Sequence, residues 1–421
     1  MTRRLAHRIS LAPRISVILK LFFPMLVALA AMALAGCGGS GGSSSSSGGG
    51  NTPPPVNNTQ PIAVNAGPAN NSANAAFTSV TVCNPGTATC TTVPDVLVDT
   101  GSTGLRILRS ALNLTVTNSS DGSGNPLAAC AQFVDGSFAW GSVAKADIQL
   151  AGEIASSVPI EVIADPSVPN IPTACSNGGA NLNTVTALAA NGILGVGLFA
   201  QDCGPGCAPG GVTPIPPVYF SCPSSGCVAT TMALASQLQN PVHLFPQDNN
   251  GILLALPTVP ASGAATLAGS MIFGIGTQSN NALTGVTVYT TDQVGNFSTI
   301  FNNQTFSKSF IDSGSNGIFF LDVASTGIPI CAKPNASFYC PASTQNLTAT
   351  NKGLNGNSAP VPFSIANADQ LFTTHDSAFI NLGGPNPGAF DWGLPFFYGR
   401  NVFVAIEGQS TSGGTGPFWA Y

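Results

Sequence analysis

The residues best placed to do chemistry form two copies of one four-residue motif: Asp99-Thr100-Gly101-Ser102 and Asp312-Ser313-Gly314-Ser315. Each copy follows an apolar stretch, so we expect each Asp at the end of a buried strand, on a tight turn rich in hydroxyl groups. The composition would produce one such match by chance only roughly 0.05 times. Two carboxylates on facing turns can share one proton and activate a water molecule for hydrolysis.

The segments around the motifs read as strands and turns, and their order repeats in the two halves. Hairpins are predicted at 77–99 and at 133–150, the second turning near Asp135-Gly136. A short apolar strand at 191–195 ends in Gly, and 390–406 supplies a similar strand after the second motif. Such a repeat is typical of a duplicated half-molecule. Only 230–239 has the apolar spacing of a helix.

The composition indicates an exported, β-rich protein. Charged residues make up only 7% of the chain, while Gly and Pro number 48 and 33. Five of the 12 Lys and Arg lie before residue 21, and none of the 17 Asp and Glu does, so the remainder is strongly acidic. An acidic surface argues against nucleic acid as a partner.

The first 36 residues have the pattern of an export signal, with a basic leader followed by an apolar run. The run ends in Leu34-Ala35-Gly36-Cys37, which resembles a bacterial lipobox and implies lipidation of Cys37. An ordinary signal peptide with an incidental Cys is the alternative. Residues 37–61 then form a flexible Gly/Ser/Pro linker. The expected location is the cell envelope, on the outer membrane, with the lipid as the membrane anchor.

The other ten cysteines are an even number in a chain sent to an oxidising compartment, so we expect disulfides. Their spacing suggests that Cys83 pairs with Cys90 and Cys331 with Cys340, and Cys130 then remains for Cys175 once the other cysteines are assigned. The group formed by Cys203, Cys207, Cys222 and Cys227 is expected to pair within itself. A zinc site in that group is the alternative, and export favours disulfides.

The two motifs, their order and their spacing resemble the pepsin-like aspartic peptidases over nearly all of residues 70–421. The resemblance extends to Asn191-Gly192-Ile193-Leu194-Gly195 and to the closing segment Trp392-Gly393-Leu394-Pro395-Phe396. It implies an all-β dominated, bilobal double barrel with a few short helices and an active cleft between the lobes. The expected lobes are 62–256 and 257–421.

The resemblance also implies a role for each motif residue. Asp99 and Asp312 would form the catalytic dyad, one as general base on water and the other as hydrogen-bond donor to the scissile carbonyl. Thr100 and Ser313 would brace the two loops, and Ser102 and Ser315 would hydrogen-bond the outer carboxylate oxygens. Gly101 and Gly314 let the turns close without a Cβ clash.

Three positions depart from the pattern of that family. Phe133 takes the place of the usual flap Tyr, in a flap that also contains Asp135 and Gly136. Arg106 replaces an aromatic residue after the first motif, and Asp391 replaces an apolar residue in the closing segment. Asp391 is either a third acid near the cleft floor or a solvated loop carboxylate, and the second interpretation is favoured.

These observations favour a lipid-anchored aspartic endopeptidase that is monomeric and takes a polypeptide substrate in the cleft. No cofactor and no metal site is expected, since two isolated Asp turns offer few ligands for Ca²⁺. The alternative is an inactive module of the same fold that binds a peptide or glycan or has a structural role. A binding module has no chemical need for both Asp residues and all four hydroxyls, which favours the enzyme.

Overall fold

The computed structural model describes residues 57–211 and 217–421. The predicted leader at 1–36, the lipidation site Cys37 and most of the predicted linker therefore lie outside the described residues. Within the described part of the chain, no helix has both the length and the apolar character needed to cross a membrane.

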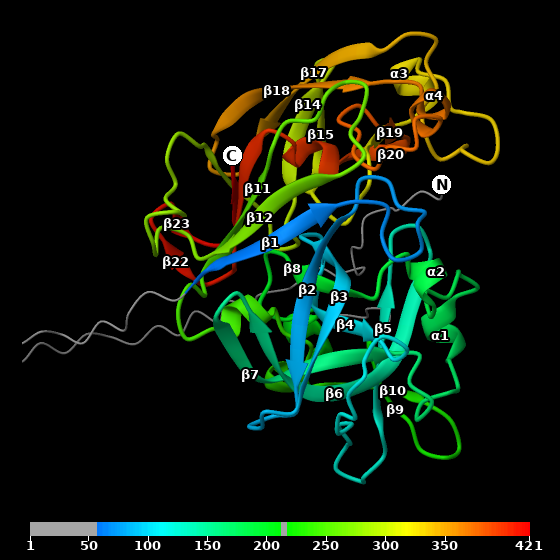
Figure 1. The fold of residues 1–421 in the computed structure, drawn as a ribbon, viewed down its shortest axis with the longest axis vertical. Helices are drawn as coiled ribbons and strands as arrows, with labels where there is room; N and C mark the ends of the chain where they lie inside the picture. The colour runs from blue at the N-terminus through cyan, green and yellow to red at the C-terminus, as the bar shows by residue number, and fades with distance from the viewer. Residues whose placement is uncertain (1–56, 212–216) are drawn as a thin grey trace, which may run out of the picture. The chain divides into compact units, whose positions relative to one another are not determined.

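The fold is built almost entirely from strands (Figure 1). One sheet of fifteen strands has the order β10-β9-β5-β6-β7-β4-β8-β3-β2-β1-β12-β11-β21-β24-β13. Its strands are β1 Thr59–Val64, β2 Ala76–Cys83, β3 Cys90–Asp99, β4 Thr103–Leu108, β5 Leu127–Gln132, β6 Phe138–Leu150, β7 Glu153–Ile163, β8 Gly192–Val196, β9 Tyr219–Ser221, β10 Val228–Thr230, β11 Gly251–Leu256, β12 Leu267–Phe273, β13 Val288–Thr290, β21 Arg400–Ala405 and β24 Phe418–Ala420.

A second sheet of seven strands has the order β18-β17-β14-β15-β20-β16-β19, and β22 pairs with β23. These strands are β14 Phe297–Phe301, β15 Gln304–Ile311, β16 Ile318–Leu321, β17 Gln345–Lys352, β18 Ser358–Ile365, β19 Gly383–Gly384, β20 Asn386–Trp392, β22 Ser410–Thr411 and β23 Gly414–Thr415. The helices are short: α1 Thr173–Ser176, α2 Val185–Leu188, α3 Val323–Thr326, α4 Ala368–Phe372, and the 3-10 turns η1 Gly204–Cys207, η2 Leu234–Ser236, η3 Pro241–Leu244 and η4 Leu394–Phe397.

The strands gather in two lobes. In Figure 1, β2 to β10 lie in the lower part and β14 to β20 in the upper part, with β1, β11 and β12 between them. The prediction of an all-β, two-lobed fold with a few short helices is confirmed.

The two halves repeat one strand arrangement around each motif. β3 ends in the first motif and runs parallel to β8, which is antiparallel to β4. In the second half, β15 leads into the motif and runs parallel to β20, which is antiparallel to β16. Glycines occupy the same place next to each Asp, Gly195 on β8 and Gly393 after β20, because a Cβ at either one would meet neighbouring backbone.

The core of the second lobe is aromatic. Phe390 and Trp392 of β20 stack on each other with ring centroids 5.5 Å apart, and Phe390 also stacks on Phe320 at 5.3 Å. Because side chains alternate along a strand, Asp391 between them points to the opposite face of β20. The aromatic core therefore fixes the direction of the Asp391 side chain.

Two details of the sequence prediction were wrong. The segment 230–239 forms only the end of β10 and the turn η2, because Gln237 turns its side chain inward to bond Gly204 and Met232 while Leu234 is 41% exposed. The linker predicted at 37–61 extends too far, since β1 begins at Thr59 and pairs with β12 over six residues. The lobe boundary predicted at 256/257 falls between β11 and β12, which pair as antiparallel neighbours.

A buried asparagine connects segments of the two halves. The Asn74 side chain donates to the carbonyls of Asn316 and Phe379 at 2.9 and 2.8 Å. It accepts from the Phe379 amide at 2.7 Å and from the Tyr398 hydroxyl at 2.8 Å. Asn74 has φ 49°, a left-handed conformation that Asn adopts more readily than most residues.

We expect Asn74→Ala to lower the free energy of unfolding by about 2–5 kcal/mol, because it leaves several buried polar groups unpaired. Urea unfolding followed by fluorescence measures this change. Asn113→Ala, at an exposed position, is the matched control and should change stability by less than about 0.5 kcal/mol. Equal effects of the two substitutions would contradict this role of Asn74.

Candidate active site

The strand ends bring the two motifs face to face. A Cβ added at Gly101 would lie 2.5 Å from the Asp312 carboxyl carbon, and one at Gly314 would lie 2.7 Å from Asp99 Oδ1. The Asp99 and Asp312 carboxyl groups are close enough to hydrogen-bond each other. Only glycine permits this approach, so the third residue of each motif sets the distance between the carboxyl groups.

The second residues of the motifs hold the loops together by a reciprocal pair of hydrogen bonds. The Thr100 amide donates to Ser313 Oγ at 3.1 Å, and the Ser313 amide donates to Thr100 Oγ1 at 2.9 Å. Each hydroxyl also donates across to the strand before the other motif: Ser313 Oγ to the Val98 carbonyl at 2.8 Å, and Thr100 Oγ1 to the Ile311 carbonyl at 3.5 Å. These four hydrogen bonds join the two motif loops directly to each other.

Each carboxylate is held by its own turn. Asp99 accepts from the Gly101 amide at 2.8 Å and from Ser102 Oγ at 2.6 Å. Asp312 accepts from the Gly314 amide at 2.7 Å and from Ser315 Oγ at a longer 3.2 Å. The two turns are alike except for the length of this last bond.

The dyad lies entirely out of solvent, since Asp99 and Asp312 both have 0% exposed surface. Burial, and next the neighbouring charge of Asp312, raise the pKa of Asp99 well above its ordinary value, and the bonds from Ser102 and Gly101 oppose this rise. Two buried carboxyl groups in contact cannot both ionise at low cost, so the pair retains a proton.

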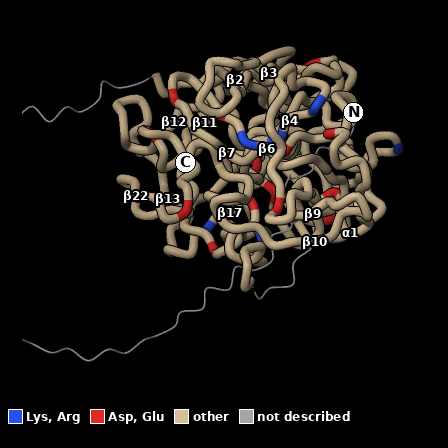
Figure 2. Tube along the Cα trace, turned by 90° about the horizontal axis from the view of Figure 1, so that it is seen from below, with Lys and Arg blue, Asp and Glu red and all other residues tan. Residues whose placement is uncertain are grey.

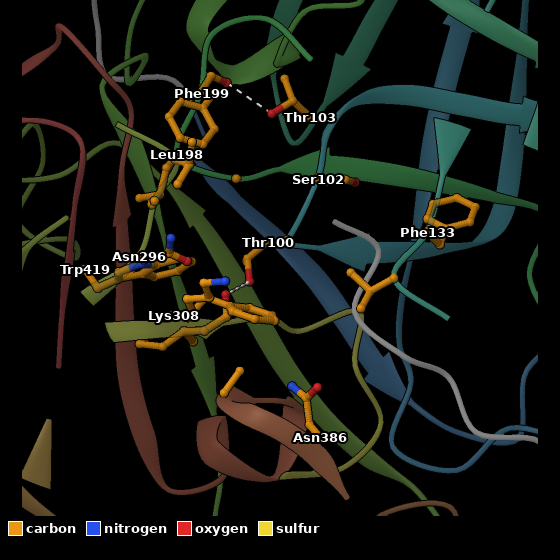
Figure 3. Close-up of a pocket in the computed structure, with 18 residues that line it drawn as sticks. Thr100, Ser102, Thr103, Phe133, Leu198, Phe199, Asn296, Lys308, Asn386 and Trp419 are labelled. Atoms are coloured by element: carbon orange, nitrogen blue, oxygen red, sulfur yellow. Dashed lines mark hydrogen bonds between the residues drawn. The ribbon is translucent and has the colours of Figure 1, made fainter. Parts of the chain in front are cut away.

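A pocket of about 540 Å³ lies against the motifs. Thr100, Gly101 and Ser102 form part of its wall, and its other walls come from both halves of the chain. Figure 3 shows Thr100 in the middle of the labelled side chains, with Phe133 and Trp419 on opposite sides. The lining residues not predicted from the sequence are Thr103, Val134, Gly197, Leu198, Phe199, Val294, Gly295, Asn296, Lys308, Phe310, Ile311, Asn386, Ala389 and Trp419.

The predicted flap is a hairpin turn between β5 and β6. Phe133 and Val134 line the pocket, and Asp135 accepts from the amide and the hydroxyl of Ser137 at 2.9 and 2.6 Å. Gly136, with φ 84°, donates its amide to the Phe133 carbonyl and closes the turn. The hairpin therefore presents an apolar tip to the pocket.

The structure corrects the favoured interpretation of Asp391. This residue lies in β20, is 0% exposed, and is not a solvated loop carboxylate. Its Oδ2 accepts from Ser315 Oγ at 2.7 Å, the same hydroxyl that bonds Asp312. Asp391 lies at the start of the strand predicted at 390–406, but its burial depends on Ser315, a residue distant in the chain, which the local pattern does not reveal.

Arg106 is the centre of a second buried charge cluster below the first motif. Its guanidinium contacts Glu161 at 3.0 Å and Asp202 at 3.2 Å, and it donates to the Thr103 carbonyl at 2.8 Å. Tyr219 donates its hydroxyl to Asp202. Charged residues are sparse along the trace in Figure 2, which makes this group of buried charges distinctive. The cluster joins the turn after Ser102 to the segment that carries Leu198 and Phe199.

Five disulfides join all ten cysteines of the described residues: Cys83–Cys90, Cys130–Cys175, Cys203–Cys207, Cys222–Cys227 and Cys331–Cys340. The predicted pairs are confirmed. The four cysteines at 203–227 are consumed in disulfides, so they do not supply thiolates for the alternative zinc site.

One family model matches most of the chain. Residues 54–421 match the family model described as "Protein of unknown function (DUF3443)". No curated protein matches the sequence. Among solved structures, the crystal structure of aspartic proteinase from Irpex lacteus is similar at 15% sequence identity and a TM-score of 0.49, covering 86% of this chain and 96% of that chain.

The Arg106 cluster predicts a pH dependence of stability. Burial raises the pKa of Glu161 to about 7 and that of Asp202 to about 6, against 4.5 and 3.8 as their ordinary values. A carboxyl whose pKa is raised by folding contributes stability below its unfolded pKa and loses it as pH rises through the folded pKa. We therefore expect the free energy of unfolding to fall between about pH 4 and pH 7.

Glu161→Gln should make the free energy of unfolding fall by less over this pH range, with a difference on the order of 2–4 kcal/mol from wild type. The Arg106 guanidinium then keeps one carboxylate partner, Asp202. Urea unfolding of both proteins at pH 4, 5, 6 and 7 measures the difference. Identical slopes of stability against pH in the two proteins would contradict the expectation.

Proposed function

This chain belongs to the DUF3443 family, and we propose that it is an aspartic-type endopeptidase that cuts polypeptides in the cell envelope. The observation that supports this proposal is the dyad itself. Asp99 and Asp312 face each other at hydrogen-bonding distance on loops that brace each other reciprocally. A purely structural pair of buried carboxyl groups would be costly, so their retention in contact favours catalysis.

The proposed reaction uses the one proton that the pair shares. The ionised carboxylate removes a proton from water, and the protonated carboxyl donates a hydrogen bond to the scissile carbonyl oxygen. The amides of Gly101 and Gly314 hold the carboxylates in a fixed orientation during this exchange. No covalent intermediate is required, because water is the nucleophile.

The pocket beside the motifs is the proposed substrate site. Its apolar lining, with Phe133, Leu198, Phe199 and Phe310, suits the side chains of an extended peptide. We further propose that lipidation of Cys37 tethers the enzyme to the envelope, in keeping with the lipobox resemblance of the sequence.

A second candidate is a peptide- or glycan-binding module without activity. The complete burial of Asp99 and Asp312 favours it, because water and a scissile carbonyl can reach the dyad only when the cleft walls separate. The flap hairpin at 133–137 borders this pocket and is the segment whose movement would open it.

Asp99→Asn and Asp312→Asn are each expected to lower kcat/KM by at least about 10²–10⁴-fold, because each removes one partner of the shared proton. The assay incubates the full-length protein with an unfolded protein from pH 3 to pH 8 and identifies the cut sites by mass spectrometry. The wild-type activity is expected in the acid range and to extend above pH 4, since the pKa of Asp99 is raised.

Asp369→Asn, at an exposed carboxylate on α4, is the control for loss of one negative charge and should retain activity. No cleavage by folded wild-type protein at any pH would overturn the proposed enzyme and favour the binding module.

Lys308 predicts a feature of substrate choice. It is exposed, lies on β15 four residues before Asp312, and is the one charged residue among the described residues lining the pocket. At about 3.3 Å per residue its Cα lies roughly 13 Å from that of Asp312, about four residues of an extended substrate. We expect peptides with Asp or Glu about four residues from the cut to be preferred.

Lys308→Glu should reverse this preference by about fivefold or more in kcat/KM, measured on paired peptides that differ only by Glu or Lys at that position. Lys352→Glu, an exposed charge reversal on β17, is the matched control. If the Lys308→Glu protein kept the wild-type preference, Lys308 would not contact the substrate.

A further inference from the structure

Asp391 is a buried carboxylate that the proposed dyad chemistry does not use. The repeat within the chain shows that the fold does not require it. Asp391 lies opposite Phe319 on β16, and the equivalent pair in the first half is Ile193 opposite Arg106 on β4. Ile193 is buried and apolar, so the same strand position packs well without a carboxylate.

The hydroxyl group of Ser315 lies between Asp391 and Asp312 and hydrogen-bonds both. Ser315 Oγ lies 2.7 Å from Asp391 Oδ2 and 3.2 Å from Asp312 Oδ2. In the first half, the equivalent hydroxyl of Ser102 bonds Asp99 at 2.6 Å. A hydroxyl has one hydrogen to donate and can accept another, so Ser315 can bond both carboxyl groups only if one of them carries a proton.

We infer that Asp391 is a third acid of the site, which exchanges a proton with Asp312 through the hydroxyl of Ser315. In one state, Asp391 holds the proton and donates to Ser315 Oγ, which donates to the Asp312 carboxylate. In the other state both hydrogens have moved along the chain: Asp312 donates to Ser315 Oγ, which donates to the Asp391 carboxylate. The number of protons is the same in both states. This inference rests on the proposed function, because it concerns the proton that the dyad uses.

The surroundings of Asp391 limit which charges act on it. Its own strand β20 carries no other ionisable side chain, and β16 carries none. β15 contributes Lys308, which is exposed in the pocket, and the loop that follows contributes Asp312. Asp99 faces Asp312 from the other motif. Among β15, β16, β20 and the motif loop after β15, the acid group nearest in the chain to Asp391's hydrogen-bond partner Ser315 is Asp312, which contacts Asp99.

An ionised Asp391 would disfavour ionisation of the dyad, because like charges oppose each other strongly in a buried site. The dyad would then keep its single proton to a higher pH. Asp391→Asn removes this charge, so the upper limb of the profile of kcat/KM against pH is expected to move to lower pH by about one unit. Activity at the acid optimum is expected to fall less than tenfold.

Two variants separate charge from packing. Asp391→Asn keeps the size of the side chain, while Asp391→Ile copies Ile193 of the first half, and both should shift the limb in the same direction. In the Ser315→Ala background the buried Asp391 has lost its hydrogen-bond donor and is expected to stay protonated and uncharged, so Asp391→Asn should shift the limb by less than half as much. An undiminished shift there would overturn the link through Ser315, and profiles of both Asp391 variants that superimpose on wild type would overturn the inference.

A second measurement does not depend on cleavage. Titration of ¹³C-labelled aspartate carboxyl groups by NMR, on the full-length protein, should show the midpoint of Asp312 moving to lower pH by about one unit in Asp391→Asn. An unchanged midpoint would overturn the coupling. A wild-type protein that titrates in this way and cuts nothing would overturn the proposed function alone.

Discussion

The structure depends on one constraint: two carboxyl groups must be held against each other in a dry site. Their mutual repulsion and the loss of hydration both oppose this arrangement. The reciprocal bonds between Thr100 and Ser313 offset the cost by joining the two loops directly. Glycines at the third motif position let the carboxyl groups meet, and glycines on the neighbouring strands let the turns seat against the sheet. The lobes, the pocket and the flap are arranged around this contact.

The two halves share a backbone plan and differ in the charges placed on it. In the first half the cross-strand pair below the motif is Arg106 with Ile193, and in the second it is Phe319 with Asp391. Each of these two pairs therefore contains one buried ionisable residue, a base on β4 in the first pair and an acid on β20 in the second. Arg106 is matched by Glu161 and Asp202, whereas Asp391 is linked to the dyad through Ser315. The asymmetry gives the two aspartates different surroundings within a symmetric frame.

Much of the fold and the centre of the site could be predicted because their signals are local. Strand, turn and glycine patterns placed the motifs. Short cysteine spacings predicted Cys83–Cys90 and Cys331–Cys340, and Cys130–Cys175 followed by elimination. Features made by distant residues could not be read in this way. The partners of Arg106 lie 55 and 96 residues further on in the chain, so their contact needed the sheet order. The segment 230–239 has helical spacing, yet the buried amide of Gln237 determines its path. Lys308 lacked any motif to mark it.

The pairing of β1 has a consequence for the order in which the chain can fold. Thr59 lies opposite Ile272, and β11 lies opposite β21 near the C-terminal end. Strands early in the chain therefore pair with strands that are synthesised much later. Contacts between residues so far apart in the chain slow folding and leave strand edges open meanwhile. A polypeptide emerging from its N-terminal end cannot complete the strands between the lobes until nearly all of it is present, because β11 pairs with β21. Local disulfides such as Cys83–Cys90 can close during that interval and limit the conformations of each hairpin before the sheet is complete.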